Sequence, residues 1–219
     1  MKSQPGEAAI MQNMEQIAND MATYTDMLVS SGLLHLKGGN CSARLGDDVV
    51  ITRTKTFKQD IVADRLIRAP IDSDEPVENA SSTLSMHRWI YRKTDAQAVI
   101  HAHSYYTALV SFYVDEFRII DDNGLIYLGP TVPIVAAKKH WGWAEVDEEI
   151  AEALVDHPVV ILKWHGPFAK GDSMAQAYHN IQAMETAARF YMDIWRMRNV
   201  IGEPDYVPWV GPPEWSEKK

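Results

Sequence analysis

The sequence predicts an α/β fold, with long amphipathic helices near both ends of the chain and short apolar strands between them. Apolar residues recur at spacings of three and four over residues 10–28 and again over 177–198, which is the periodicity of a helix that buries one face. The run 159–164 is almost continuously apolar, as expected of a strand buried on both faces. The 219 residues suit one large domain, with a core of about residues 10–198 and an irregular tail at 202–219.

Composition and charge argue against several classes of partner. The formal net charge is −9 and Lys and Arg are not clustered, which argues against a nucleic-acid partner because phosphates are neutralised by grouped cations. No stretch approaches the roughly 18 uninterrupted apolar residues of a membrane span. Cys41 is the one cysteine, and the N-terminal MKSQPGEAAI has no apolar signal core. A cytoplasmic enzyme or binding protein is therefore expected.

The first half of the chain predicts a helix, a glycine turn, strands and a second helix. Gly32 is placed to end the first helix, and residues 38–42, GGNCS, form a turn whose bare N–H groups can approach a ligand. Residues 49–52 indicate a strand. Short apolar pieces and acidic turns between 60 and 78 predict strand, turn and strand, with 67–71 followed by 72–76. Ser81, Ser82 and Thr83 supply N-cap residues for a helix through His87 and Tyr91.

The second half alternates strands and helices. The predicted elements are a strand ending at 101–103, a helix at 105–112, an apolar run ending in an acidic turn at 117–124, a strand at 131–136, a helix at 145–156 and a strand at 159–164. A turn is expected at 166–172. Ser173 and Gln176 then form a capping box for the long C-terminal helix.

Three histidines form a candidate metal site. His101 and His103 are two residues apart at the end of an apolar run, so on a strand both imidazoles point to one face. His165 follows the other buried strand and would complete a three-nitrogen set, the usual protein share of a catalytic zinc. On the residues alone, a structural role in hydrogen bonding is the alternative interpretation of such histidines.

Two polar segments are candidates for binding an anion. Residues 53–56, RTKT, carry two cations and two hydroxyls and fit either a phosphate or carboxylate site or a solvated loop. The helix start at Ser81 and Ser82 offers hydroxyls and free N–H groups. Asp121 and Asp122 lie in the acidic turn after residue 117 and most simply reverse the chain.

Five motifs occur in a fixed order: Gly-Gly-Asn-x-Ser, Ile-Thr-x-Thr, Ser-Ser-x4-His, His-x-His, and His-Gly before a long helix. Together they resemble the class II aldolase/adducin family over roughly residues 10–198. The resemblance implies a three-layer α/β/α sandwich around a mainly antiparallel sheet, and a homotetramer with active sites between subunits. It implies that zinc, or another divalent metal, is bound by His101, His103 and His165. The positions that hold a substrate phosphate in the family's aldolases correspond here to Gly39, Asn40, Thr54, Ser81 and Ser82.

Two positions depart from the aldolase pattern. Thr83 stands where the aldolases have a glutamate that moves the substrate proton, and a threonine hydroxyl cannot act as a base near neutral pH. Lys55 stands where their phosphate loop has glycine, and its charge suits a phosphate or a substrate carboxylate. Dehydratases and epimerases of the same fold take a carboxylate from the segment after His-x-His. Here that segment contains Asp115, Glu116, Asp121 and Asp122, and Asp122 is the first choice, with Glu116 second.

The resemblance therefore leaves three functions open. The first is zinc-dependent cleavage or formation of a C–C bond in a small, phosphorylated hydroxy-carbonyl compound through an enediolate, which the metal stabilises. The second keeps the metal and ends in dehydration, epimerisation or decarboxylation, because Thr83 replaces the aldolase glutamate. The third is a non-catalytic, adducin-like assembly domain, against which the three intact histidines argue.

Overall fold

Eight strands of the computed structural model form one sheet, described together with the helices over residues 7–56, 60–138 and 143–202. The strand order is β3-β2-β1-β4-β8-β7-β6-β5. The strands are β1 (Asn40–Leu45), β2 (Asp48–Ile51), β3 (Ile67–Pro70), β4 (Ala98–His101), β5 (Glu116–Arg118), β6 (Thr131–Val135), β7 (Val159–Leu162) and β8 (Gly166–Gly171). Among these strands only β6 and β7 pair in parallel, so the predicted mainly antiparallel sheet is confirmed.

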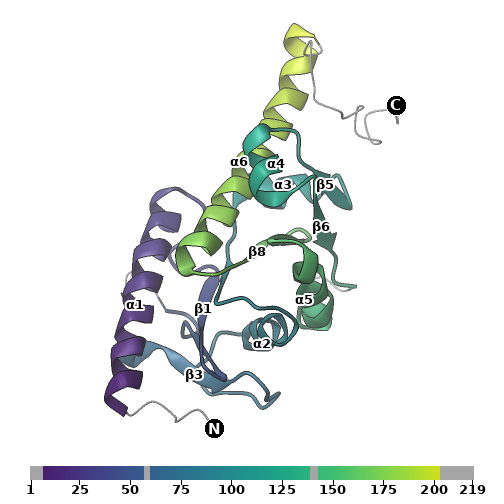
Figure 1. The fold of residues 1–219 in the computed structure, drawn as a ribbon. Coiled ribbons are helices and arrows are strands. Elements are labelled where there is room, and N and C mark those ends of the chain that lie inside the picture. Colours follow the sequence, from purple (N-terminus) through teal and green to yellow (C-terminus); the bar gives the residue numbers. More distant parts are fainter. Residues whose placement is uncertain (1–6, 57–59, 139–142, 203–219) are drawn as a thin grey trace.

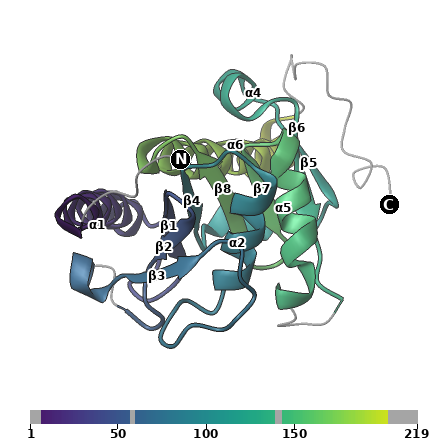
Figure 2. The ribbon, with the colours of Figure 1, turned by 60° about the horizontal axis from the view of Figure 1, so that its bottom comes forward.

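Helices cover both faces of the sheet and give the predicted three layers (Figure 1, Figure 2). One face packs against α1 (Glu7–Ser30), α3 (Tyr105–Val110), α4 (Asp122–Leu128) and α6 (Met174–Ile201), and the other against α2 (Leu84–Lys93) and α5 (Asp147–Asp156). Two 3₁₀ turns, η2 (Ala63–Arg65) and η3 (Trp143–Val146), complete the described elements.

Successive side chains of the strands alternate between the two hydrophobic cores. In β7, Val159 and Ile161 belong to the core under α1 and α6, whereas Val160 and Leu162 belong to the core under α2 and α5. All four are at most 3% exposed, which confirms the strand predicted to be buried on both faces. Because successive side chains point to opposite faces, an apolar run of this kind satisfies both layers at once.

Four local predictions were wrong. Residues 40–45 form β1 where a turn was expected over 38–42, and residues 166–171 form β8 where a second turn was expected. The acidic turn at 121–124 instead begins α4, and residues 60–78 contain one strand, β3, where two were predicted. The two missed strands pair with β4 on either side, so tertiary pairing overrides a local sequence rich in glycine and polar residues.

The helices α6 and α2 begin at capping residues that the sequence predicted. Ser173 caps α6 by accepting a hydrogen bond from the backbone N of Gln176 at 3.2 Å. The side chain of Gln176 donates to Asn180 instead of returning to Ser173, so only half of the predicted capping box forms. In α2 the N-cap is Thr83, without a side-chain capping bond.

Two predictions stay predictions. The division into one domain with a core of about residues 10–198 is not tested, and the predicted tail lies outside the described residues beyond Gly202. Within the described ranges, no helix has both the length and the apolar character needed to cross a membrane.

Candidate active site

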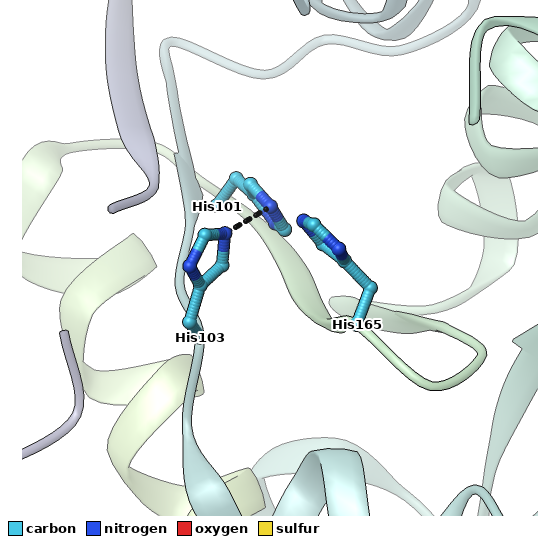
Figure 3. Close-up of side chains that lie close together, drawn as sticks. All are labelled: His101, His103 and His165. Carbon is cyan, nitrogen blue, oxygen red and sulfur yellow. Dashed lines mark hydrogen bonds between the residues drawn. The ribbon is translucent and has the colours of Figure 1, made fainter. Parts of the chain in front are cut away.

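The structure brings His101, His103 and His165 together (Figure 3), with one ligand atom of each within 4.8 Å of the others. His101 is the last residue of β4, and His103 follows it at the predicted spacing of two. His165 comes from the short loop between β7 and β8. We call these three residues the histidine cluster.

The ring of His101 is fixed on both sides. Its Nδ1 donates to the carbonyl oxygen of Pro167 at 3.0 Å, and the ring stacks on Phe168 with centroids 4.0 Å apart. The side chain is buried, with 1% of the residue exposed. Because Nδ1 carries the proton, Nε2 keeps its lone pair for a metal ion, the usual arrangement for a ligating histidine.

The electrostatics of the cluster suit a cation. Burial lowers the pKa of His101 well below its usual value, and positive charge on His103 or His165 would lower it further. Burial also lowers the pKa of His165. Neutral imidazole is the form that binds metal, so the protein holds these rings in the ligating state.

The spacing of the ring nitrogens also fits one ion. The Nε2 atoms of His101 and His103 lie 3.1 Å apart, and two nitrogens on one tetrahedral zinc at about 2.0–2.1 Å are about 3.4 Å apart. Without metal, Nε2 of His103 can donate to Nε2 of His101, whose ring proton is on Nδ1. The donor set therefore fits a divalent metal, and imidazole serves zinc and several other ions.

The loop that carries His165 is anchored at each of its residues. Lys163 forms an ion pair with Asp115, and the backbone N of Trp164 donates to Ser111 Oγ at 2.8 Å. Trp164 adopts a φ of 64°, a left-handed conformation that costs a non-glycine residue energy. The backbone N of His165 donates to Leu162 at 3.1 Å, which closes the loop.

Glycines allow the backbone to approach the His-x-His segment closely. A Cβ added at Gly39 would lie 2.3 Å from the carbonyl oxygen of His101, and one at Gly166 would lie 2.2 Å from that of Ala102. A Cβ at Gly38 would lie 2.8 Å from Nδ1 of His103. The Gly-Gly pair was expected to approach a ligand, and in the structure it packs against the segment that carries two of the histidines.

Two predicted anion segments lie side by side. Arg53 and Ala80 form a β-bridge, and the backbone N of Thr54 donates to the carbonyl of Asn79 at 2.9 Å. We call residues 53–55 and 80–82 the anion loops. Arg53, Thr54, Lys55 and Ser82 are exposed and Ser81 is half-buried. Lys55 has a φ of 58°, a backbone conformation that favours glycine.

Asn40 joins the anion loops to the histidine cluster through the sheet. It is the first residue of β1 and pairs with His101 in the register of β1 and β4. Thr52, two residues before Thr54, donates its backbone N to Cys41 at 3.0 Å. The start of β1, the end of β4 and the anion loop at 53–55 therefore lie at the same end of the strands.

Thr83 is buried at the N-cap of α2 and contributes no charge. It is 9% exposed, and its Oγ1 lies 3.1 Å from Ser81 Oγ. In the described chain, the cluster of potential metal ligands contains three histidines and no carboxylate.

The structure does not bring the predicted acid/base carboxylates to the histidine cluster within one chain. Asp122 is an exposed residue in the first turn of α4, and α4 packs on α6 with Gly124 close to Ala187. Glu116 is exposed at the start of β5. Asp121 caps α4 by accepting from the backbone N of Gly124 at 2.8 Å.

The sequence analysis missed a chain of four buried polar side chains next to the site. Tyr91 OH lies 2.8 Å from Ser42 Oγ, Ser42 Oγ lies 2.6 Å from His87 Nδ1, and His87 Nε2 lies 2.5 Å from Asn40 Oδ1. Ser42 and His87 are fully buried. His87 was assigned only to the helix after Ser81, and its spacing from the serines was the one available signal.

A cavity of about 370 Å³ adjoins two members of the histidine cluster. His103 and His165 line it together with Leu109, Phe112 and Trp164. A small molecule can therefore reach the histidines from a partly apolar side.

Residues 19–192 match the family model for the Class II Aldolase and Adducin N-terminal domain, and the chain belongs to this family. It is 28% identical over 153 residues to L-fuculose phosphate aldolase of Methanocaldococcus jannaschii, covering 69% of this chain and 82% of that protein. It is 26% identical over 195 residues to methylthioribulose-1-phosphate dehydratase of a Sulfurihydrogenibium species, covering 82% and 90%.

Among solved structures, l-fuculose-1-phosphate aldolase from Thermus thermophilus superimposes with a TM-score of 0.79 at 28% identity, covering 87% of this chain and 98% of that one. The family resemblance and the α/β fold predicted from the motifs are confirmed. The chain is thus placed among the enzymes of the class II aldolase superfamily, whose members named here perform different reactions.

Proposed function

We propose that this protein is a metal-dependent lyase that cleaves or forms a C–C bond in a small, phosphorylated hydroxy-carbonyl compound. The observation that carries the proposal is the convergence of three imidazoles, one of them at the strand end paired with Asn40, beside the anion loops. A relative named as an L-fuculose phosphate aldolase supports the substrate class.

The proposed roles divide between the two parts of the site. His101, His103 and His165 would hold Zn²⁺ or another divalent ion, which when bound supplies the positive charge that polarises a carbonyl and stabilises an enediolate oxygen. Gly39, Asn40, Thr54, Lys55, Ser81 and Ser82 would bind the phosphate through N–H, O–H and ammonium donors. These contacts orient the reacting carbons toward the histidine cluster.

The proton transfer is assigned to a carboxylate supplied by a second copy of the chain. Thr83 cannot serve, because a hydroxyl that ionises far above neutral pH is a poor base. Asp122 is the first candidate and Glu116 the second; both are exposed and available to another subunit. This assignment goes together with a proposed cytoplasmic homotetramer whose active sites lie between subunits. Native mass spectrometry can test the number of subunits.

Dehydration is the second candidate reaction, and Thr83 favours it. Loss of water also begins with an enolate next to a polarised carbonyl and does not need the glutamate that the aldolases place after the two serines. A relative named as a methylthioribulose-1-phosphate dehydratase supports this alternative.

Metal content tests the first step of the proposal. The purified protein is expected to bind one divalent ion per chain, and His165→Ala to lose it, because two nitrogens bind the ion more weakly than three. His157→Ala, at the C-terminal cap of α5, is the matched control and should keep the metal. A chain that cannot be loaded with any divalent metal would contradict the proposal and favour the adducin-like alternative.

Product analysis distinguishes the two reactions. Metal-loaded protein is incubated with L-fuculose 1-phosphate and with methylthioribulose 1-phosphate, and the products are identified by mass spectrometry. Two carbonyl fragments indicate C–C cleavage, whereas a product that has lost one water indicates dehydration. A Thr83→Glu variant sharpens the result: if it gains aldol cleavage that the native protein lacks, the native reaction is dehydration, epimerisation or decarboxylation.

A further inference from the structure

The buried chain from Tyr91 to Asn40 has one consistent direction of hydrogen bonds. Asn40 Oδ1 can only accept, so His87 Nε2, 2.5 Å away, carries the ring proton and donates it. Nδ1 of His87 is then an acceptor, and Ser42 Oγ donates to it at 2.6 Å. The hydroxyl of Ser42 in turn accepts from Tyr91 OH at 2.8 Å.

The orientation of the Asn40 amide belongs to the same pattern. The two ends of a carboxamide point to opposite sides of its carbon atom, so holding Oδ1 against His87 turns Nδ2 away from His87. Nδ2 keeps both N–H donors. Asn40 pairs with His101 across β1 and β4 and follows Gly39. These donors therefore lie at the end of the strands where the histidine cluster and the anion loops are found.

We propose that His87 is a positioning residue that holds the Asn40 side chain with its NH₂ group toward the substrate, which makes this position selective for a hydrogen-bond acceptor such as a phosphate oxygen. The ligand part of the inference rests on the proposed function. An Asn side chain that could rotate freely would present its oxygen equally well, and an oxygen facing a phosphate is repulsive. The selected group is therefore an acceptor such as phosphate, and not a hydroxyl that must donate.

His87 does not act on the reaction directly. It is fully buried, and its ring meets Phe168 edge-on at a centroid distance of 6.0 Å, while Phe168 stacks on His101. Phe168 thus contacts both His87 and His101. Burial lowers the pKa of His87 to about 3, so the ring stays neutral, with one donor and one acceptor, at physiological pH.

Two substitutions separate positioning from packing. In His87→Gln the side chain can still donate to Asn40 and accept from Ser42, whereas His87→Leu fills the space without either bond. Thr25→Val is the control for loss of a buried hydroxyl outside the chain from Tyr91 to Asn40, since Thr25 bonds only within α1. The full-length, metal-loaded proteins are titrated with inorganic phosphate, and KM and kcat are measured with the substrate that the native protein turns over.

The expected result is a selective loss of anion affinity. His87→Leu should bind phosphate about tenfold or more weakly, as expected when one hydrogen bond to a charged group is lost. Its KM should rise by a similar factor while kcat changes little. His87→Gln and Thr25→Val should resemble the native protein. A folded His87→Leu with native phosphate affinity and KM would overturn the inference.

The protonation of His87 provides a test that needs neither a variant nor a ligand. Long-range ¹⁵N–¹H correlation spectra of the native protein should show the proton of His87 on Nε2. A proton on Nδ1 would reverse the chain, leave Asn40 Oδ1 without its donor, and overturn the inference. If the native protein binds neither phosphate nor a ketose phosphate, the proposed function fails, and the spectra still decide whether His87 orients Asn40.

Discussion

The histidine cluster and the anion loops differ in how firmly the fold holds them. His101 is 1% exposed, hydrogen-bonded through Nδ1 and stacked on Phe168. The anion loops are mostly exposed and are joined by the bridge between Arg53 and Ala80. The three histidines are therefore set by close packing of the backbone, whereas the polar side chains of the anion loops sit on loop ends that can vary without disturbing the core.

The largest effect is expected where packing around the cluster is closest. Gly39→Ala should destabilise the fold by about 3 kcal/mol or more and weaken metal binding, because its Cβ would meet the His101 carbonyl at 2.3 Å. Gly46→Ala is a matched control: its φ is 62° against 59° for Gly39, and nothing lies within 4 Å of its Cβ. Urea unfolding should show a cost of only about 1 kcal/mol for the control. Equal costs for the two would show that close packing does not hold the cluster.

A second prediction concerns the helix that follows His103. The Glu185 carboxylate accepts from the backbone N of Tyr106, the backbone N of Thr107 and Thr107 Oγ1, all within 2.8 Å. Glu185→Ala removes these bonds at the start of α3 and should cost about 2–3 kcal/mol in unfolding free energy. Thr186→Ala, an exposed neighbour on α6, should cost less than about 0.5 kcal/mol. A Glu185→Ala variant as stable as native would show that α3 is held by its apolar contacts alone.

A third prediction is a pH dependence that belongs to His87. Its pKa is about 3 in the fold against an ordinary value of 6.5, so between these values the unfolded chain binds the extra proton. Stability from this residue is complete above about pH 6.5 and is lost as the pH falls toward 3, by roughly 1.4 kcal/mol per pH unit. Denaturant unfolding of metal-free protein from pH 7 to 4.5 should show a shallower decline for His87→Gln than for the native chain. Parallel curves would contradict the assignment.

The smallest effect on stability is expected in the anion loops. Lys55→Gly removes a charge and relieves a left-handed conformation at φ 58°, but glycine also gains freedom in the unfolded chain. These effects offset each other, so stability should change by less than about 0.5 kcal/mol. Phosphate affinity should fall about three- to tenfold through loss of the ammonium group. A large loss of stability would mean that this loop is as tightly held as the histidine cluster.

The features that the sequence predicted well are those with a local period. The helical stripes gave α1 and α6, the apolar run gave β7, and the spacing of two placed His101 and His103 on one face. The convergence of His165 with them followed from the family resemblance and from two strand ends, and the structure brings the three rings together. Their role in binding metal stays a proposal.

The features that were missed depend on contacts between distant segments. β8 contains Gly166, Pro167 and Lys170, which give no alternating pattern, yet it pairs with β4 and β7 along its length. His87 lies 47 residues from Asn40 in sequence, and no local pattern indicates that they share a hydrogen bond. Asp122 was selected as a carboxylate in a turn, and the local sequence did not indicate the helix α4 that carries it.

The hairpin of β7 and β8 has a consequence for how the protein matures. Its loop supplies His165, and Pro167, only two residues later, supplies the carbonyl that orients His101 from 66 residues away. The position of His165 and the alignment of His101 thus both depend on β8 pairing with its neighbours. We expect the protein to bind a metal ion during refolding only after that pairing. The rate at which it takes the ion from a chelating dye should therefore report when the central sheet closes.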